Sequence, residues 1–203
     1  MENKELHEIL EKVLPLIFKY GVRSLTMDDI ASNLGISKKT LYQHFENKAD
    51  LIEKIMLMHI TGERDLCQNV MNEETNAIDQ LIQIYSYNLK SVGNINHTLI
   101  FELKKYYGAV WQRFEEHKNN FIMHSVTSNI KLGQKQGLFR KDLNAEIISR
   151  IHTNRIDMIM DGDVFPSSEF SLKDVIKELL VYHLRGISTA KGIEYLESNQ
   201  MNL

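Results

Sequence analysis

The sequence contains very little cysteine and proline. Its single cysteine, Cys67, excludes a disulfide within the chain and a cysteine-based zinc cluster, and it is most simply a small core residue. The only prolines among the 203 residues are Pro15 and Pro166, and segments with the composition of β-strands are scarce. These absences predict an all-α fold.

Long apolar runs and catalytic motifs are absent as well. No apolar stretch reaches the length of about eighteen residues that marks a membrane span, and the start MENKELHEILEK is too acidic for a secretion signal, so we expect a cytoplasmic protein without a membrane partner. The chain has no glycine-rich phosphate loop, no Gly-x-Ser-x-Gly and no His-Glu-x-x-His, and its histidines lack ligand spacing. We therefore expect no catalytic residues, no cofactor and no metal; a helical-bundle enzyme is a remote alternative.

The most informative positive pattern lies between Thr26 and Lys48. Thr26 followed by Asp29 predicts a helix that starts with a capping box. Gly35 predicts a left-handed end to this helix, and Ser37 predicts the cap of a second one. Two short helices joined by a glycine turn have the geometry of a helix-turn-helix, which enters DNA.

The second of these helices has a polar outer side. Leu41 and Phe45 are one turn apart and define the buried side, and Asn47 predicts the cap of a third helix with Asp50 at its third position. The side chains that point away from Leu41 and Phe45 are polar or cationic: Lys39, Thr40, Tyr42 and Gln43. A solvated helical hairpin is the plainer alternative for such a face.

The charge of the chain is small and unevenly distributed. The formal net charge is −3, yet residues 36–48 carry Lys38, Lys39 and Lys48 against Glu46 alone, which leaves +2. Such a weak footprint predicts few phosphate contacts for one copy and a modest salt dependence. Useful affinity for DNA then requires two copies of the unit.

The stretch ILEKVLPLIFKYGVRSLTMDDIASNLGISKKTLYQHFENKADLI resembles the N-terminal DNA-binding domain of the TetR family of bacterial transcriptional regulators. The resemblance implies a helix-turn-helix domain over residues 1–47 and a larger helical domain for ligand binding and dimerisation over residues 48–203, with about nine helices in total. It also implies contacts to base edges from Lys38, Lys39, Thr40 and Gln43, and contacts to phosphates from Thr26, Ser37, Tyr42, His44 and Lys48.

Helical periodicity and chain breaks predict the other helices. In the first helix, which Gly21 ends, Pro15 predicts either a kink or a start later than the periodicity suggests. Beyond the head we expect helices over residues 48–70, 74–90, 97–107, 109–131, 144–160 and 172–189.

The last two predicted helices carry wide apolar faces, and part of each face covers the core of the chain itself. In the TetR family the last two helices form a four-helix bundle across a two-fold axis, so the resemblance implies a homodimer that binds a palindromic operator in double-stranded DNA. The predicted interface residues are Ile147, Ile151, Met158, Val175, Leu179 and Ile187.

Aromatic residues gather in the middle helices, where they form either plain core or a ligand cavity. The resemblance implies a pocket there for an unknown small, largely apolar molecule that releases a repressor from DNA. We expect Met56, Tyr85, Phe101, Tyr107, Trp111 and Phe114 to line it, with His97, Glu102, His124 and Arg155 as possible polar anchors. A DNA-binding dimer regulated by a protein partner instead of a small molecule is the alternative function.

Overall fold

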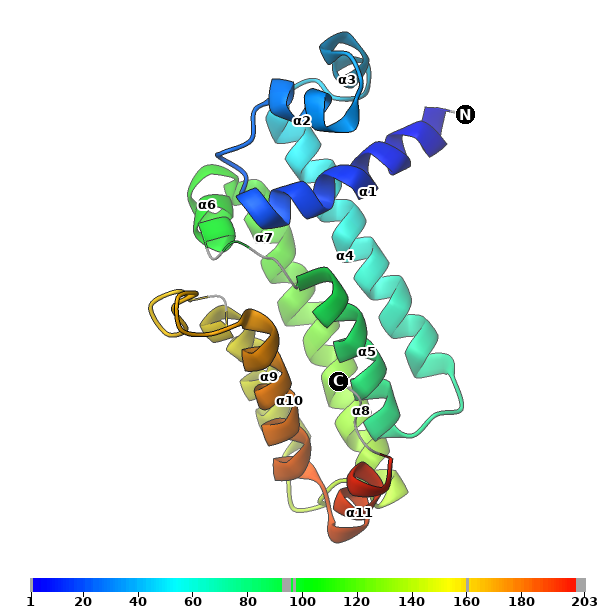
Figure 1. Cartoon of the computed structure of the whole chain (residues 1–203). Helices are drawn as coiled ribbons and strands as arrows, with labels where there is room; N and C mark the ends of the chain where they lie inside the picture. The colour runs from blue at the N-terminus through cyan, green and yellow to red at the C-terminus, as the bar shows by residue number, and fades with distance from the viewer. Residues whose placement is uncertain (1, 93–95, 97, 160, 200–203) are drawn as a thin grey trace. The chain divides into compact units, whose positions relative to one another are not determined.

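The computed structural model describes residues 2–92, 96, 98–159 and 161–199. This part of the chain is helical, and its only β-pairing is an isolated antiparallel bridge between Phe139 and Ser188, which confirms the all-α fold. The helices, in chain order, are α1 (Glu2–Tyr20), α2 (Met27–Leu34), α3 (Lys38–His44), α4 (Lys48–Asn72), α5 (Ala77–Val92), α6 (Thr98–Tyr106), α7 (Gly108–Glu116), the π-helix η1 (His117–Ile122), α8 (Met123–Gln136), α9 (Ala145–Ile159), α10 (Leu172–Ile187) and α11 (Ala190–Ser198) (Figure 1).

The chain divides into two compact units. Unit 1 contains α1, α2, α3, α4 through Glu63, α6, and α7 through Glu115. Unit 2 begins within α4 at Arg64 and contains α5, η1 and α8 to α11. Helix α4 is therefore one continuous element with residues in both units. The DNA-binding domain expected over residues 1–47 lies within unit 1, and its boundary after residue 47 stays a prediction.

Unit 1 is built around an apolar core to which α1, α2, α3 and α4 all contribute. Val13, Ile17, Ile30 and Leu41 are completely inaccessible to solvent in it. Helix α1 runs without interruption from Glu2 to Tyr20 with Pro15 inside it, so the alternative of a late helix start is wrong. Tertiary packing of the apolar face, rather than local propensity, holds this helix together.

Unit 2 has a second apolar core, formed where α5 packs against α8 and α10. The end of α8 allows a close approach of the following chain, because a Cβ at Gly133 would lie only 2.0 Å from Cδ2 of Phe139. Phe139 is itself fully buried, and Gly137 ends α8 in the left-handed conformation with φ 73°. The glycine thus makes room for the aromatic ring that closes this end of unit 2.

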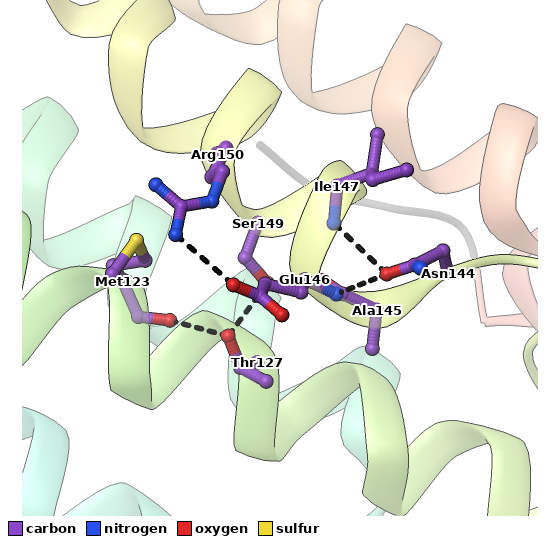
Figure 2. Close-up of polar contacts among 8 residues, drawn as sticks. All are labelled: Met123, Thr127, Asn144, Ala145, Glu146, Ile147, Ser149 and Arg150. Atoms are coloured by element: carbon purple, nitrogen blue, oxygen red, sulfur yellow. Dashed lines mark hydrogen bonds and ion pairs between the residues drawn. The ribbon is translucent and has the colours of Figure 1, made fainter.

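Polar contacts fix the packing of α9 against α8 (Figure 2). Asn144 Oδ1 caps α9 by accepting from the backbone N–H groups of Glu146 and Ile147 at 3.0 and 3.1 Å. Across the helix pair, the hydroxyl of Thr127 on α8 lies 2.9 Å from Oγ of Ser149 on α9. Ser149 is completely buried, so its hydroxyl sets the register between the two helices.

Two helix predictions need correction. The helix expected over residues 109–131 is a continuous run of α7, η1 and α8, and its middle turn is a π-helix, which carries one residue more per hydrogen-bonded ring than the α-helical pattern. The helix expected to end at 189 ends at Ile187, because Ser188 is extended and the hydroxyl of Thr189 caps a further helix, α11, by accepting from Gly192 N at 3.2 Å.

Candidate nucleic-acid interface

The first helix of the predicted DNA-binding motif, α2, starts and ends as its sequence indicates. Thr26 Oγ1 accepts from Asp29 N at 3.1 Å, and Asp29 Oδ2 accepts from Thr26 N at 2.8 Å, which completes a capping box. The hydrogen bonds from Thr26 lower the pKa of the Asp29 carboxyl. Gly35 ends the helix with φ 66° and donates its N–H to Ser32 O at 3.1 Å. The turn is therefore fixed by backbone geometry that only glycine adopts at little cost.

The second helix, α3, is anchored by its cap and by two apolar side chains. Ser37 Oγ accepts from Thr40 N at 3.0 Å. Leu41 is fully buried and Phe45 is 1% exposed, and the Lys54 ammonium lies 5.3 Å from the Phe45 ring centroid. These contacts confirm the predicted buried side and leave the opposite side of α3 available for a partner.

The available side of α3 carries the polar residues that the sequence indicates. Lys39, Tyr42 and Gln43 are exposed, and Thr40 is half-buried with its hydroxyl 2.8 Å from Oγ of Ser37. Lys39 has an ammonium group, Gln43 has both a donor and an acceptor, and Tyr42 has a hydroxyl on an apolar ring. Together they can donate to base edges and to phosphate oxygens.

Two other residues expected at the interface have partners within the chain. Lys38 is ion-paired with Asp28 on α2 at 2.7 Å, which raises the pKa of its ammonium group. The His44 side chain is only 9% exposed, and its Nε2 lies 3.7 Å from Glu5 of α1. The structure thus places His44 on the buried side of α3, so it favours Lys39 over Lys38 and His44 as contacts to DNA.

The third cap positions Lys48 at the start of α4. Asn47 Oδ1 accepts from Ala49 N at 2.9 Å and Asp50 N at 3.1 Å, as its position predicts. Lys48 is half-buried, and this burial lowers the pKa of its ammonium group. The negative charges of Glu102 and Asp29 act in the opposite direction and raise the pKa, but their effect is smaller. A cation at a helix N-terminus, with the free N–H groups of the first turn, suits a phosphate oxygen.

A contact that sequence reasoning missed secures the turn after α1. Glu102 on α6 accepts from Arg23 N at 3.0 Å, and Arg23 donates to the hydroxyl of Tyr106 at 3.1 Å. Gly21 has φ 79°, and a Cβ there would lie 2.8 Å from Oε2 of Glu102. Glu102 therefore joins α6 to the turn, although the sequence suggested it only as a ligand anchor. No spacing in the chain connects residues 21 and 102.

The residues expected to line a ligand pocket do not form one group. Met56 is part of the unit 1 core, and Tyr107 and Trp111 pack half-buried against that core, with Phe114 5.2 Å from Trp111 between ring centroids. Phe101 is 59% exposed, with the Lys105 ammonium 5.3 Å from its ring centroid. This exposure argues against a place for Phe101 in an enclosed pocket.

The remaining pocket and anchor residues belong mostly to unit 2. Tyr85 is half-buried on α5 and lies 3.3 Å from His152 through its hydroxyl. His124 is exposed on α8, whereas Arg155 lies near Tyr85 with its guanidinium 5.3 Å from the ring centroid. His97 lies outside the described residues. The structure thus brings Tyr85 and Arg155 together in unit 2, as it does Trp111 and Phe114.

The predicted interface residues on α9 and α10 separate into two sets. Ile147, Ile151 and Met158 on α9 are 56%, 63% and 40% exposed and lie on one side of the helix. Val175 and Ile187 are 7% and 3% exposed within unit 2, so little of either side chain is open to a second copy, and their place in a dimer contact stays a prediction. Leu179 is half-buried, and Tyr182, which was not predicted, is 79% exposed. The spacing of apolar residues on α10 shows that the helix has an apolar face, but it does not show which of these residues the core of unit 2 covers.

These features define a class of protein. Capped helices α2 and α3, a left-handed glycine turn and a polar outer face on α3 form a helix-turn-helix, the motif of DNA-binding regulators. Among the described residues no group of His, Cys, Asp and Glu is placed to hold a metal ion. In the same residues no helix has both the length and the apolar character to cross a membrane.

Comparison with known proteins shows which regulators the chain is similar to. Residues 9–55 match the family described as "Bacterial regulatory proteins, tetR family". The chain is 24% identical to the uncharacterized HTH-type transcriptional regulator YvaF of Bacillus subtilis over 89% of this chain and 94% of that protein. It is 20% identical to the HTH-type transcriptional repressor KstR2 of Mycolicibacterium smegmatis over 91% of each chain.

A solved structure agrees with these relatives. A TetR family transcriptional regulator from Agrobacterium tumefaciens is similar in fold with a TM-score of 0.74 at 16% identity, over 93% of this chain and all of that one. The family match over residues 9–55 and the relatives along most of the chain support a DNA-binding transcriptional regulator of the TetR family. The relatives and fold neighbours are named as regulators and not as enzymes, in agreement with the sequence-based expectation.

Proposed function

We propose that the protein is a homodimeric repressor that binds a palindromic operator and leaves it when a small, largely apolar ligand binds. The observation that carries the proposal is the outer side of α3, where Lys39, Tyr42 and Gln43 are exposed above the buried pair Leu41 and Phe45. The relative KstR2 is named as a transcriptional repressor, which supports repression over activation for this protein. In this proposal Lys39 and Gln43 contact base edges, and Lys48 contacts a phosphate.

Dimerisation is supported by the side of α9 that no described residue covers. Ile147, Ile151 and Met158 follow one another at one-turn to two-turn spacing and are all exposed. Three apolar side chains in a row on one helix are typical of an interaction site. A dimer formed through this face would carry two copies of α3, one for each half-site of a palindrome whose half-sites lie about 34 Å apart.

Release of DNA by a ligand is supported by the continuity of α4. The helix starts at Lys48 in the candidate interface and ends at Asn72 in unit 2. A ligand that binds better to one tilt of α4 would change the separation of the two α3 helices, and DNA affinity would fall by the ratio of the two ligand affinities. The contact between Glu102 and the turn after α1 gives α6 a second connection to the DNA-binding helices.

The experiment that tests the proposal makes the α9 face charged. Ile151→Glu should convert a dimer to a monomer in sedimentation equilibrium, and it should abolish binding to DNA that the wild-type chain enriches from a random pool. Lys141→Glu introduces the same side chain at an exposed site outside the face and should leave both properties unchanged. A wild-type monomer that binds DNA as a single copy would contradict the proposal.

A further inference from the structure

Four polar side chains from three helices of unit 2 form one connected cluster. Tyr85 comes from α5, His152 and Arg155 come from α9, and His183 comes from α10. Nδ1 of His152 lies 3.1 Å from Nε2 of His183, and Nε2 of His152 lies 3.3 Å from the Tyr85 hydroxyl. The Arg155 guanidinium lies 3.4 Å from the same Nε2 and donates to Leu179 O at 3.2 Å.

The hydrogen-bond chemistry assigns protons within this cluster. A guanidinium can only donate, so Nε2 of His152 accepts and its Nδ1–H donates to His183. Both imidazoles are therefore neutral. Burial lowers the pKa of His152 to about 4, and burial together with His152 and Arg155 lowers the pKa of His183 far below its ordinary value. The one charge that the cluster retains is the guanidinium of Arg155.

Among the described residues, this guanidinium has no anionic partner. Its contacts are a carbonyl oxygen, an imidazole nitrogen and the face of the Tyr85 ring at 5.3 Å. Burial lowers its pKa to about 10. Two other cations that are buried or half-buried, Lys118 and Lys54, are paired with acids: Lys118 with Asp157 at 2.7 Å and Lys54 with Asp50 at 2.9 Å. A desolvated charge without a counter-ion costs stability, so the cluster is incomplete as it stands.

The missing group is an anion that carries one charge. A carboxylate matches the single charge of Arg155, whereas a phosphate carries up to two at neutral pH. The guanidinium repels a metal cation. Tyr85, Arg155 and His183 are only half-buried, so the cluster can be reached from solvent. Ile82 and Ile148, like Tyr85, are half-buried and pack against the unit 2 core, and they offer apolar contact to the rest of such a molecule.

We propose that Tyr85, His152, Arg155 and His183 bind the carboxylate of an organic acid with an apolar body. Arg155 forms the ion pair, and the Tyr85 hydroxyl donates a hydrogen bond. The inference rests on the proposed ligand response, for which it names the class of ligand. It goes beyond that response because it assigns the anchor to side chains of α5, α9 and α10 in unit 2 and not to the aromatic residues of unit 1.

Calorimetric titration of the full chain with octanoate and phenylacetate tests the site directly. Octanamide and phenylacetamide have the same shapes without the charge, and octyl phosphate carries a phosphate on the same tail. The carboxylates should bind at least about tenfold more tightly than the amides, the factor that about 1.4 kcal/mol provides. Octyl phosphate should bind less tightly than octanoate.

Two substitutions on α9 distinguish an effect on the proposed site from a general effect of removing an arginine from this helix. Arg155→Met should weaken carboxylate binding by about tenfold or more, while Arg150→Met should have no effect, because Arg150 is exposed and paired with Glu146 at 3.0 Å (Figure 2). Arg155→Met should also unfold at the same temperature as the wild type, or a higher one, when no carboxylate is present. Tyr85→Phe keeps the ring but lacks the hydroxyl, so it should bind the carboxylates more weakly than the wild type. This variant tests the site if Arg155→Met does not fold.

Any of four results would overturn the proposal. A purely apolar site would not favour carboxylates over amides, so equal affinities for the two would overturn the proposal. So would wild-type affinity in Arg155→Met, or tighter binding of octyl phosphate. A lower unfolding temperature of Arg155→Met without carboxylate would show that Leu179 O is its proper partner. Because these titrations contain no DNA, a failure here leaves the proposed repressor function intact, and the failure of DNA binding leaves the carboxylate site intact.

Discussion

Unit 1 and unit 2 differ in what they bury. The buried polar and charged residues of the described chain all belong to unit 2: Gln80, His117, Lys118, Ser125, Asn129, Ser149, His152, Thr153 and Ser188. The core of unit 1 is apolar, and its described polar residues are half-buried, as His44 and Lys48 are, or exposed. An apolar core gives a fixed shape, which suits a motif that must match a DNA groove. Buried polar groups can form hydrogen bonds with a bound molecule or change their protonation state, which suits the ligand response proposed for unit 2.

The largest effect should come from opening the unit 1 core. Phe45→Ala removes a side chain that is 1% exposed, and the cavity should lower the free energy of unfolding by about 3–5 kcal/mol. Hydrogen exchange should show the loss in unit 1 more than in unit 2. Tyr42→Ala is the matched control, because Tyr42 is 44% exposed and its loss should leave stability within about 0.5 kcal/mol. Equal destabilisation by both variants would remove the distinction between the two sides of α3.

The outer side of α3 should determine which sequence is bound. Lys39→Ala should weaken binding to the preferred sequence by about 1–3 kcal/mol and relax the preference itself, since a lysine donates to guanine. Lys48→Ala should weaken binding to all sequences alike, because a phosphate contact carries no sequence information. Gel-shift titrations on preferred and random DNA separate the two. Equal losses of Lys39→Ala on both kinds of DNA would show that Lys39 does not read bases.

Acid should destabilise unit 2 through its buried histidines. His152 is neutral in the fold with a pKa of about 4, against 6.5 when unfolded, so its stabilising effect is present above 6.5 and is lost as the pH falls towards 4. It faces Tyr85 on α5, Arg155 on its own helix and His183 on α10. From about pH 7.5 to about pH 5.5 the loss from His152 should be about 1.3 kcal/mol.

Urea unfolding of the wild type and of His152→Gln at several pH values measures this contribution. The glutamine keeps hydrogen-bonding capacity but does not titrate, so the variant should depend less steeply on pH over this range. His183 should add to the wild-type slope in the same direction, because its pKa is lowered too. Parallel pH profiles for the two proteins would mean that His152 is not buried in neutral form.

The smallest effect should come from a helix cap. Thr26→Ala removes the acceptor for Asp29 N and should cost about 1 kcal/mol in the stability of unit 1. Thr26→Ser keeps the hydroxyl and should cost much less. The difference in urea midpoint between the two variants isolates the cap. An alanine variant as stable as the serine variant would show that the capping box contributes nothing measurable.

Sequence reasoning predicted most of the helix-turn-helix because its determinants are local. The side chains of Thr26, Ser37 and Asn47 each cap a helix by accepting from a backbone N–H no more than three residues further along the chain. Gly35 ends α2 because its own backbone adopts the left-handed conformation. Leu41 and Phe45 were identified as buried from their spacing within one short helix, and the structure confirms both. Short-range chemistry of this kind does not depend on the rest of the chain.

The features that sequence reasoning missed depend on contacts between distant residues. Glu102 meets Arg23 across 79 positions, and the cluster around His152 draws on α5, α9 and α10. Val175 and Ile187 were assigned to the dimer contact because an apolar face does not reveal which of its residues the core of the same chain covers. Helix α11 was missed because the extended Ser188, which separates it from α10, follows a run with unbroken helical character.

The sequences enriched from a random DNA pool test the central claim most directly. The account predicts a palindrome whose half-sites are separated by about one helical turn, with the preference at one position of each half-site lost in Lys39→Ala. An enriched pool without two-fold symmetry, or one that Lys39→Ala enriches unchanged, would contradict the assignment of α3 as the element that reads the operator.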